Sequence, residues 1–427
     1  MTRFSYLNLV EGAVALILLL YPALTIAIKG GMNGSLIFIL ILCFMVWVKP
    51  PRGLSHAEWE KEWSIYAWAM ASFWLAIVIN QLYHQNFTAP EYDAPARYWL
   101  SIPVFLLLVR LRLRFLSTIQ IAFPSAAIIG YLLSYPVDTF KVGIGTMDTI
   151  HFGDFELILG VMSIMSLHWF GRDKLAMQVL KIVGFIAGIT ASIATGTRGA
   201  WIVWPVFVLM WIYFGKRKYS KLRIAMTMVG VTICGIVLFF SSETVSSRVN
   251  ELIIDVSNYE AGSANSSSGI RWQLYKASAE IFLQYPIFGA GLEGYSHTLQ
   301  RLHESGEISQ MAANIGRGEV HNELLAAAAK MGVFGLIAAS AIYFVPIMLF
   351  NRAAKSYQRI VRQAGYMGLT FVVGFLVFGL TANVLNLTMA TAFYSYTVAV
   401  LLAVCYNVHY ETKNTQFDVP PMKDMNA

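Results

Sequence analysis

Charged residues are scarce in this sequence. Only 13% of its 427 residues are Asp, Glu, Lys or Arg, whereas 57% are hydrophobic and the mean hydropathy is +0.58. A soluble domain carries about 25% charged residues, so this composition excludes an ordinary soluble protein and predicts an integral membrane protein. The apolar runs are long enough to cross a bilayer, which takes about 20 residues for each helix.

Cysteine and paired acidic residues are also rare. The three cysteines, Cys43, Cys234 and Cys405, lie inside apolar runs and lack the spacing of metal ligands. Two short acidic motifs, Asp154-Phe-Glu156 and Glu91-Tyr-Asp93, have the carboxylates that could hold a divalent ion beside a diphosphate. Because single motifs of this kind are weak signals, we predict neither a metal nor another cofactor.

The apolar runs predict an all-α polytopic membrane protein with about 12 transmembrane helices. Their centres lie near residues 19, 40, 73, 103, 126, 163, 187, 207, 231, 337, 373 and 399. The first run, residues 10–28, lacks a small-residue cleavage site and is followed at once by another span, so we interpret it as a helix and not a signal peptide. The predicted organisation is nine spans in residues 1–240, an outer loop in 241–320, three spans in 321–408 and a tail in 409–427.

The basic residues predict the orientation. Most Lys and Arg gather in every second connection, around residues 49–61, 110–114, 172–181, 216–223 and 352–362. The positive-inside rule then places both termini in the cytoplasm and residues 241–320 outside. The net charge of +7 is therefore mainly a topology signal. A nucleic-acid partner is not expected, because its binding would need a basic face on one folded surface.

The outer segment, residues 241–320, is too polar to lie in lipid. Residues 261–269 are rich in Ser, Ala and Gly and predict a flexible loop. Residues 270–284 predict a helix that ends before Pro286 and Gly289. Its apolar residues Leu274, Ala277 and Ile281 would share one face, as in a helix that rests on the membrane interface.

Two outer arginines are candidate ligands for an anion. Arg198 lies in a Thr-Gly-Thr-Arg-Gly turn at residues 195–199, and its guanidinium could bind phosphate oxygens in bidentate fashion. The alternative is an interfacial arginine that reaches lipid headgroups. Arg271 alone would be a solvated surface residue, but paired with Arg198 it would form a diphosphate clamp.

His321-Asn322 begins the tenth predicted span. A histidine at this boundary could take a proton from a hydroxyl, and Asn322 could orient it or hold the acceptor. The alternative is a helix-capping pair. Downstream, residues 326–329 with Gly332 and Gly335 predict a small-residue face for close helix packing.

The spacing of these residues resembles a known signature. His321-Asn322, nine residues, Gly332, two residues and Gly335 are similar to the signature of the O-antigen ligase family, within the group that also contains O-antigen polymerases and protein O-oligosaccharyltransferases. Arg198 and Arg271 resemble that family's two essential outer arginines in type and location.

The resemblance implies a specific reaction in the Gram-negative inner membrane. A polysaccharide would be transferred from undecaprenyl diphosphate (the donor) to a sugar of the lipid A core (the acceptor) on the periplasmic face, without a cofactor. Arg198 and Arg271 would hold the diphosphate, His321 would act as base in a direct inverting displacement, and Asn322 would bind substrate. Membrane lipids would surround the enzyme.

Three alternatives remain open from the sequence. Some O-antigen polymerases carry Arg, ten residues and Gly in outer loops. In this sequence glycine does not stand eleven positions after any of the predicted outer arginines Arg198, Arg248, Arg271, Arg301 and Arg317. Protein O-oligosaccharyltransferases usually carry a further soluble C-terminal region, whereas only about twenty residues follow the last predicted span. A secondary transporter would be expected to show two related halves and polar sites at mid-membrane.

Overall fold

The computed structural model describes residues 5–134, 147–215, 220–260, 265–384 and 387–408. Helices account for most of these residues, and no β-strand occurs among them. Eight helical segments in the described residues are long and apolar enough to cross a membrane. The prediction of an all-α, multi-pass membrane protein is therefore confirmed. The predicted tail, residues 409–427, lies outside the described residues.

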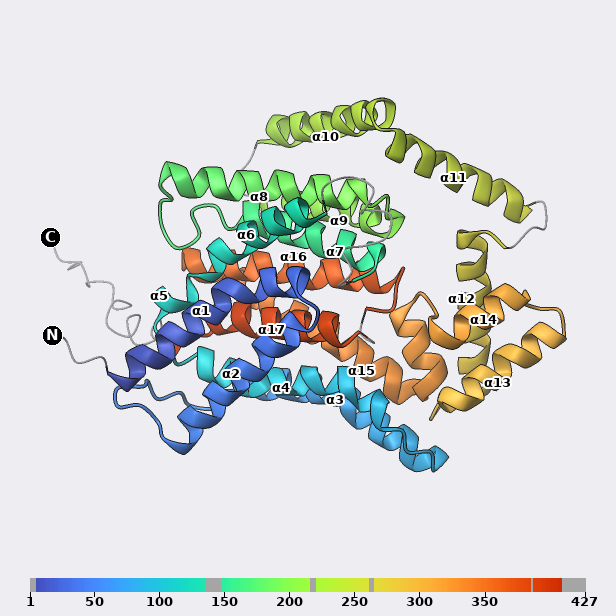
Figure 1. Ribbon diagram of the computed structural model, residues 1–427, viewed down its shortest axis with the longest axis horizontal. Coiled ribbons are helices and arrows are strands. Elements are labelled where there is room, and N and C mark those ends of the chain that lie inside the picture. Colours follow the sequence, from blue (N-terminus) through green and yellow to red (C-terminus); the bar gives the residue numbers. More distant parts are fainter. Residues whose placement is uncertain (1–4, 135–146, 216–219, 261–264, 385–386, 409–427) are drawn as a thin grey trace, which may run out of the picture.

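Most helices run along a common direction in one bundle, and a smaller group gathers at one end of it (Figure 1). The bundle contains α1 (Tyr6–Ala27), α2 (Gly31–Val48), α3 (Lys61–His84), η1 (Ala89–Tyr92), α4 (Asp93–Leu108), α5 (Leu113–Leu116), α6 (Ile119–Leu133), α7 (Thr149–Met165), α8 (Leu175–Ala194), α9 (Arg198–Gly215), α15 (Glu323–Ala353), α16 (Arg359–Gly379) and α17 (Thr388–Cys405). Helix α10 (Lys221–Ser241) and α11 (Glu243–Glu260) run along its outside and lead to α12 (Ser267–Gln284), α13 (Gly291–Glu304) and α14 (Gln310–Gly318).

Every one of the twelve predicted centres lies inside a helix. The eight membrane candidates are α1, α2, α3, the α5–α6 segment, α8, α15, α16 and α17. Helices α4 and α7 have 16 and 17 residues, which is short for a full crossing. The count of twelve membrane spans therefore stays a prediction.

Helices α7 and α17 form the centre of the bundle. The residues from His151 to Ser163 in α7 and from Ala390 to Val404 in α17 are all buried. Helices that are apolar on nearly every side need neighbours on every side. Helix α8 approaches α7 closely because both carry glycine at the contact: a Cβ on Gly188 would lie 2.4 Å from the backbone oxygen of Glu156.

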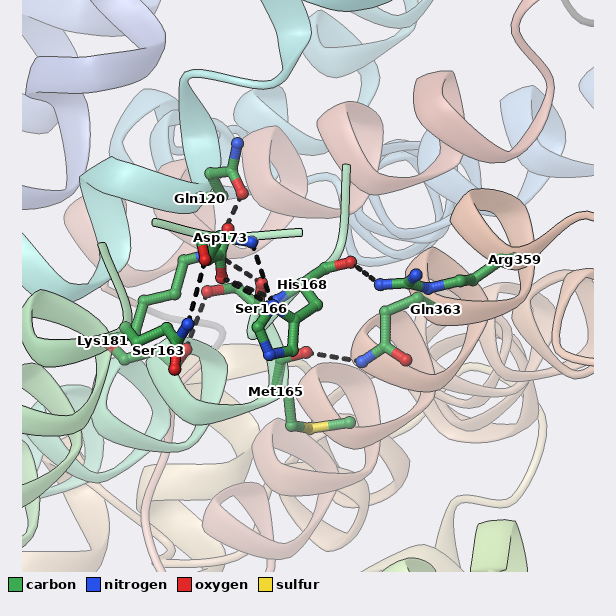
Figure 2. A network of polar contacts seen from close by, with 10 residues as sticks. Gln120, Ser163, Met165, Ser166, His168, Asp173, Lys181, Arg359 and Gln363 are labelled. Carbon is green, nitrogen blue, oxygen red and sulfur yellow. Dashed lines mark hydrogen bonds and ion pairs between the residues drawn. The ribbon is translucent and has the colours of Figure 1, made fainter. Parts of the chain in front are cut away.

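A buried ammonium group ties together one end of the bundle (Figure 2). Lys181 of α8 is fully buried and donates hydrogen bonds to Gln120 Oε1 at 2.9 Å, Ser166 O at 2.7 Å and Asp173 Oδ2 at 2.9 Å. Asp173 also accepts from the His168 N–H at 2.7 Å. The network therefore joins α6 to the turn between α7 and α8.

One basic residue, Lys181, does not lie where the topology prediction places it. We predicted it as part of a basic connection, but it lies inside α8, and its charge is matched by Asp173. A lone ammonium group would be costly at this depth, so pairing is the condition for its burial. Hydropathy alone does not reveal such a partner.

The outer segment has a small core of its own. Leu274, Ala277 and Ile281 of α12 are buried against α13, α14 and the start of α15. The predicted helix is thus present, but the prediction that this face rests on the membrane interface is wrong, because neighbouring helices cover it. Of the predicted flexible loop, residues 261–264 lie outside the described residues, and residues 267–269 already belong to α12, which Ser266 caps.

We predict that Lys181→Met destabilises the protein by about 3 kcal/mol, because it leaves the carboxylate of Asp173 buried without its counter-charge. Adding Asp173→Asn to the same variant should recover much of the loss. Thermal unfolding of the detergent-solubilised protein measures both changes. Lys174→Met, at an exposed position nearby, is the matched control, and an equal loss there would contradict the assignment.

Candidate active site

Helix α15 is kinked near its start by the loop at residues 286–290. Gly332 has φ 64° and ψ −150°, and a Cβ on it would lie 2.3 Å from the backbone oxygen of Ile287. Backbone hydrogen bonds join the loop to the kink, from Ala290 N to Ala329 O at 2.9 Å and from Val333 N to Pro286 O at 2.8 Å. Gly332 is therefore required by its conformation and by the close approach of the loop.

The kink changes the interpretation of the glycine pair. We predicted a small-residue face for packing against another helix, but Gly332 meets a loop, and a Cβ on Gly335 would lie 2.3 Å from the oxygen of Ala327 in its own helix. The two glycines thus allow α15 to bend. The bend fixes the outer segment to the helix that begins directly after His321.

Asn322 is the N-cap of α15. Its side-chain oxygen accepts a hydrogen bond from the Leu325 N–H at 3.0 Å, and the residue is 9% exposed. This satisfies one of the free N–H groups of the first turn. The capping oxygen is occupied, so contact with a substrate would fall to the amide nitrogen.

His321 occupies an unusual backbone conformation, with φ 60°. Such a value is uncommon for a residue other than glycine and costs free energy unless the surroundings hold it. The Tyr275 hydroxyl of α12 provides one restraint, because it lies 2.8 Å from His321 O and also 2.8 Å from Leu380 O. The ring is 16% exposed, so it remains partly accessible.

Glu319 lies next to the His321 ring. Its Oε1 is 3.0 Å from His321 Nδ1, close enough for charge attraction although outside hydrogen-bond geometry, and it accepts the Asn383 N–H at 3.0 Å. Burial raises the pKa of Glu319, but His321, the Asn383 N–H and the charge of His151 outweigh it and hold the pKa below its ordinary value. The carboxylate is therefore ionised beside the histidine.

Arg271 lies in the first turns of α12, one turn before Tyr275. Its side chain is half-buried, and its charge acts on the carboxyl of Asp154 in α7 and on the Tyr275 hydroxyl. Since Tyr275 also contacts the His321 backbone, the structure brings Arg271 into the same region as His321, although 50 residues separate them in the sequence.

Arg198 is the first residue of α9, at this same end of the bundle. Its side chain lies outside the described part of the structure. The turn before it packs on α7: a Cβ on Gly153 would lie 2.4 Å from Thr197 Oγ1 and 2.6 Å from Thr195 Oγ1. Gly199, the residue after Arg198, likewise lies so close to the Thr381 side chain that an added Cβ would collide with it. The backbone thus places Arg198 at the start of α7.

Two functional candidates at the start of α7 were missed from the sequence. Asp148 caps the helix by accepting from the N–H groups of Ile150 and His151, and its Oδ2 accepts from His151 Nδ1 at 2.6 Å. His151 Nε2 is buried and has no hydrogen-bond partner among the described residues. An Asp followed three residues later by His at a helix start was the available signal.

The Asp154-Phe-Glu156 motif does not form one two-carboxylate site. Residues two apart on a helix point to different sides. Asp154 is influenced by Arg271 and His151, whereas Glu156 faces Gly130 of α6, where an added Cβ would lie 1.8 Å from Glu156 Oε1. Across the described residues, no three His, Cys, Asp or Glu side chains gather in a way that could hold a metal ion.

These contacts define a candidate active site at the end of the bundle that carries α12–α14. It combines a carboxylate–histidine pair (Glu319 and His321), a second such pair (Asp148 and His151) and Arg271, with the backbone of Arg198 at its edge. A site with a base and fixed cations is suited to transfer reactions in which an anionic group leaves.

Comparison with known proteins points to one family. Residues 182–340 match the family model of the O-antigen ligases, and this range contains Arg198, Arg271, His321 and Gly332. An uncharacterized protein of Haemophilus influenzae is 24% identical over 390 residues, which is 89% of this chain and 95% of that protein. An O-antigen ligase of Escherichia coli is 21% identical over 208 residues, 48% of each chain. The resemblance to this family is thus confirmed, and it supports a function of the O-antigen ligase or polymerase type.

We predict that Gly332→Ala destabilises the protein by more than about 2 kcal/mol and lowers activity, because alanine strains at φ 64° and its Cβ collides with the Ile287 backbone. Thermal unfolding and far-UV circular dichroism measure the loss. The matched control is Gly34→Ala in α2, where a Cβ meets no atom within 4 Å. A Gly332→Ala protein as stable as the control would contradict the kink.

We predict that Asp148→Asn lowers the unfolding temperature at pH 5.5 and has little effect at pH 2. Burial raises the pKa of Asp148, but His151 and two backbone N–H groups outweigh it and lower the pKa from 3.8 to about 2. The charge of Asp148 therefore stabilises the fold above about pH 4, and this contribution is lost as the pH falls through 2. Asparagine retains the capping oxygen, so the pH dependence isolates the charge. Glu304→Gln, at an exposed site, should leave the pH profile unchanged.

Proposed function

We propose that this protein is an O-antigen ligase that transfers polysaccharide from undecaprenyl diphosphate to a sugar hydroxyl of the lipid A core. The observation that carries the proposal is the convergence of Arg271, Glu319–His321 and the Arg198 turn at the start of α7, from three separate parts of the chain that all lie within the family match. The activity is a glycosyl transfer that depends on a lipid diphosphate and needs no cofactor.

The diphosphate is the part of the donor that the arginines bind. As the bond from the anomeric carbon to the phosphate oxygen breaks, negative charge grows on the leaving diphosphate. Arg271 and Arg198 stabilise that charge, because a guanidinium binds phosphate oxygens through two parallel hydrogen bonds. The half-buried position of Arg271 strengthens this attraction, since less water screens it.

His321 is the base that removes the proton from the acceptor hydroxyl. Glu319 is ionised and holds the Nδ1 side of the ring, so Nε2 is the nitrogen that faces the hydroxyl. The resulting nucleophile attacks the anomeric carbon directly, which inverts that carbon and requires no covalent enzyme intermediate. Asn322 sets the position of His321 through the cap of α15, and its amide nitrogen contacts the acceptor.

The site lies on the periplasmic side of the inner membrane, and both chain ends lie in the cytoplasm. Basic side chains at the opposite end of the bundle support this orientation. Arg112 pairs there with Glu11, Arg352 pairs with Glu62 at 2.9 Å, and Arg359 donates to the His168 backbone oxygen. Cationic connections mark the cytoplasmic side of membrane proteins.

We predict that His321→Ala lowers kcat for transfer by a factor of about 10²–10⁴, the usual contribution of a general base, while donor binding is largely retained. Arg271→Ala and Arg198→Ala should weaken donor binding as well as rate. The assay combines the purified protein, undecaprenyl-diphosphate-linked glycan and rough lipopolysaccharide with excess EDTA, and measures the shift of the lipopolysaccharide to glycan size.

The controls are His56→Ala at the opposite end of the bundle and Arg301→Ala on α13, both exposed. Wild-type donor affinity in both arginine variants would remove the diphosphate clamp from the mechanism. A glycan that lengthens on its own lipid would identify a polymerase. Donor binding without any transfer would favour the transporter alternative. Loss of transfer in EDTA would reveal a metal requirement.

A further inference from the structure

A groove with both apolar and charged walls lies beside the candidate active site and takes no part in the mechanism above. It consists of two cavities of about 290 and 250 Å³ that share Asn80, Glu91 and Leu292 in their walls. Together they reach the size of small-molecule sites, which begins at about 300 Å³. The walls come from the end of α3, from η1, from the first turn of α4, and from α13 and α15.

The groove is anchored to the kink of α15. The Asn80 amide nitrogen donates to Phe288 O at 2.7 Å and to Lys330 O at 3.0 Å, so α3 is bound to both sides of the kink. Lys330 points its ammonium group over the Tyr295 ring, 5.4 Å from the centroid, and lines the groove. The wall is thus held in place by the same contacts that shape the active site.

One carboxylate oxygen in the groove lacks a partner. Glu91 Oε1 is buried, and no hydrogen bond reaches it from the described residues, whereas Oε2 lies 3.5 Å from Gln81 Nε2. A buried acceptor without a donor destabilises the protein. Such an atom in a cavity wall is the expected position for a donor group of a ligand, such as a hydroxyl.

One short segment, residues 318–323, joins the groove to the candidate active site. Glu319 and the backbone of His321 contact the connection after α16 and helix α12. Gly318 and Glu323, which flank them, line the groove. A displacement at the anomeric carbon brings the nucleophile in on the side away from the leaving group. The groove borders the segment that carries the proposed base, so we expect the incoming hydroxyl to come from this side.

The charges of the groove favour a hydroxyl-rich ligand over a second diphosphate. Its acidic residues Glu91, Glu293 and Glu323 are offset by the basic residues Lys330 and Arg317. Carboxylates would repel a diphosphate but accept hydrogen bonds from sugar hydroxyls. Apolar side chains in the same walls, such as Phe73 and Leu292, can contact the C–H faces of a sugar ring.

We propose that this groove binds the sugar portion of the acceptor lipid and presents its hydroxyl to His321. This assignment rests on the proposed function, because it takes the acceptor to be a saccharide. The glycan of the donor has the same chemistry, so the experiment must distinguish the two sources. The acceptor is favoured here because Gly318 and Glu323, which line the groove, flank the segment that carries His321, the proposed base.

The test uses the full-length protein in nanodiscs and two groove variants. Glu91→Gln removes the charge of the carboxylate whose Oε1 lacks a partner among the described residues, and Ala94→Phe fills the cavity from the first turn of α4. Glu304→Gln on the exposed face of α13 is the matched control. One measurement is calorimetric binding of the core oligosaccharide released from rough lipopolysaccharide. The other is the KM for rough lipopolysaccharide and for the lipid-linked donor.

Both groove variants should bind the oligosaccharide about tenfold more weakly and raise the acceptor KM to the same extent. Loss of a hydrogen bond to a charged group has about that effect in Glu91→Gln, and in Ala94→Phe the new ring occupies space that the ligand needs. The donor KM should stay within about twofold of wild type. A rise in the donor KM alone would assign the groove to the donor glycan and overturn the proposal. Unchanged binding and KM values in both variants would also overturn it.

The binding measurement tests the groove assignment, and the transfer assay tests the ligase function. If wild-type protein binds the oligosaccharide and both variants lose it while no transfer occurs, the groove is confirmed as a saccharide site and the ligase function fails. If transfer occurs and the variants behave like Glu304→Gln, the ligase function stands and the groove assignment fails.

Discussion

The contact between the loop at residues 286–290 and the kink at Gly332 is the interaction on which the rest of the site depends. It joins the outer segment to α15 through backbone hydrogen bonds and needs a residue without a side chain. Because α15 begins directly after His321 and α12 ends directly before the loop, this one contact fixes Tyr275 and Arg271 relative to His321. Asn80 extends it to α3 and so to the groove.

Burying a charge in a membrane protein is costly unless the charge is paired, and the two ends of this bundle differ in how their ionisable groups are paired. At one end, Lys181 and Asp173 compensate each other completely, and they hold the turn between α7 and α8. At the other end, compensation is incomplete: His151 Nε2 and Glu91 Oε1 are buried without hydrogen-bond partners among the described residues. The first arrangement suits a structural role. The second leaves buried polar groups without partners in the described part of the chain, and the proposed function assigns substrate binding to that end.

The candidate site could be predicted in part. His321 was proposed because its spacing to Gly332 and Gly335 resembles a family signature, and Arg271 because of its type and location. The structure brings the two into one region. Gly332 was recognised, but its role was not, since a positive φ and an approaching loop leave no trace in composition. Asp148 and His151 were overlooked because a capping residue followed by a histidine is common, and only its neighbours make it unusual. The face of α12 was misassigned because its apolar pattern is the same whether lipid or another helix covers it.

The sequence by itself determined the class of protein, the positions of its long helices and the polar character of residues 241–320, because hydropathy and helix periodicity are local properties. The tertiary structure decided which charges meet. The partners of Lys181, the contact between Glu319 and Asn383 and the walls of the groove join residues that lie far apart in the chain. Such contacts follow from how the helices pack, and packing depends on side-chain shape over the whole bundle and not on any short stretch of sequence.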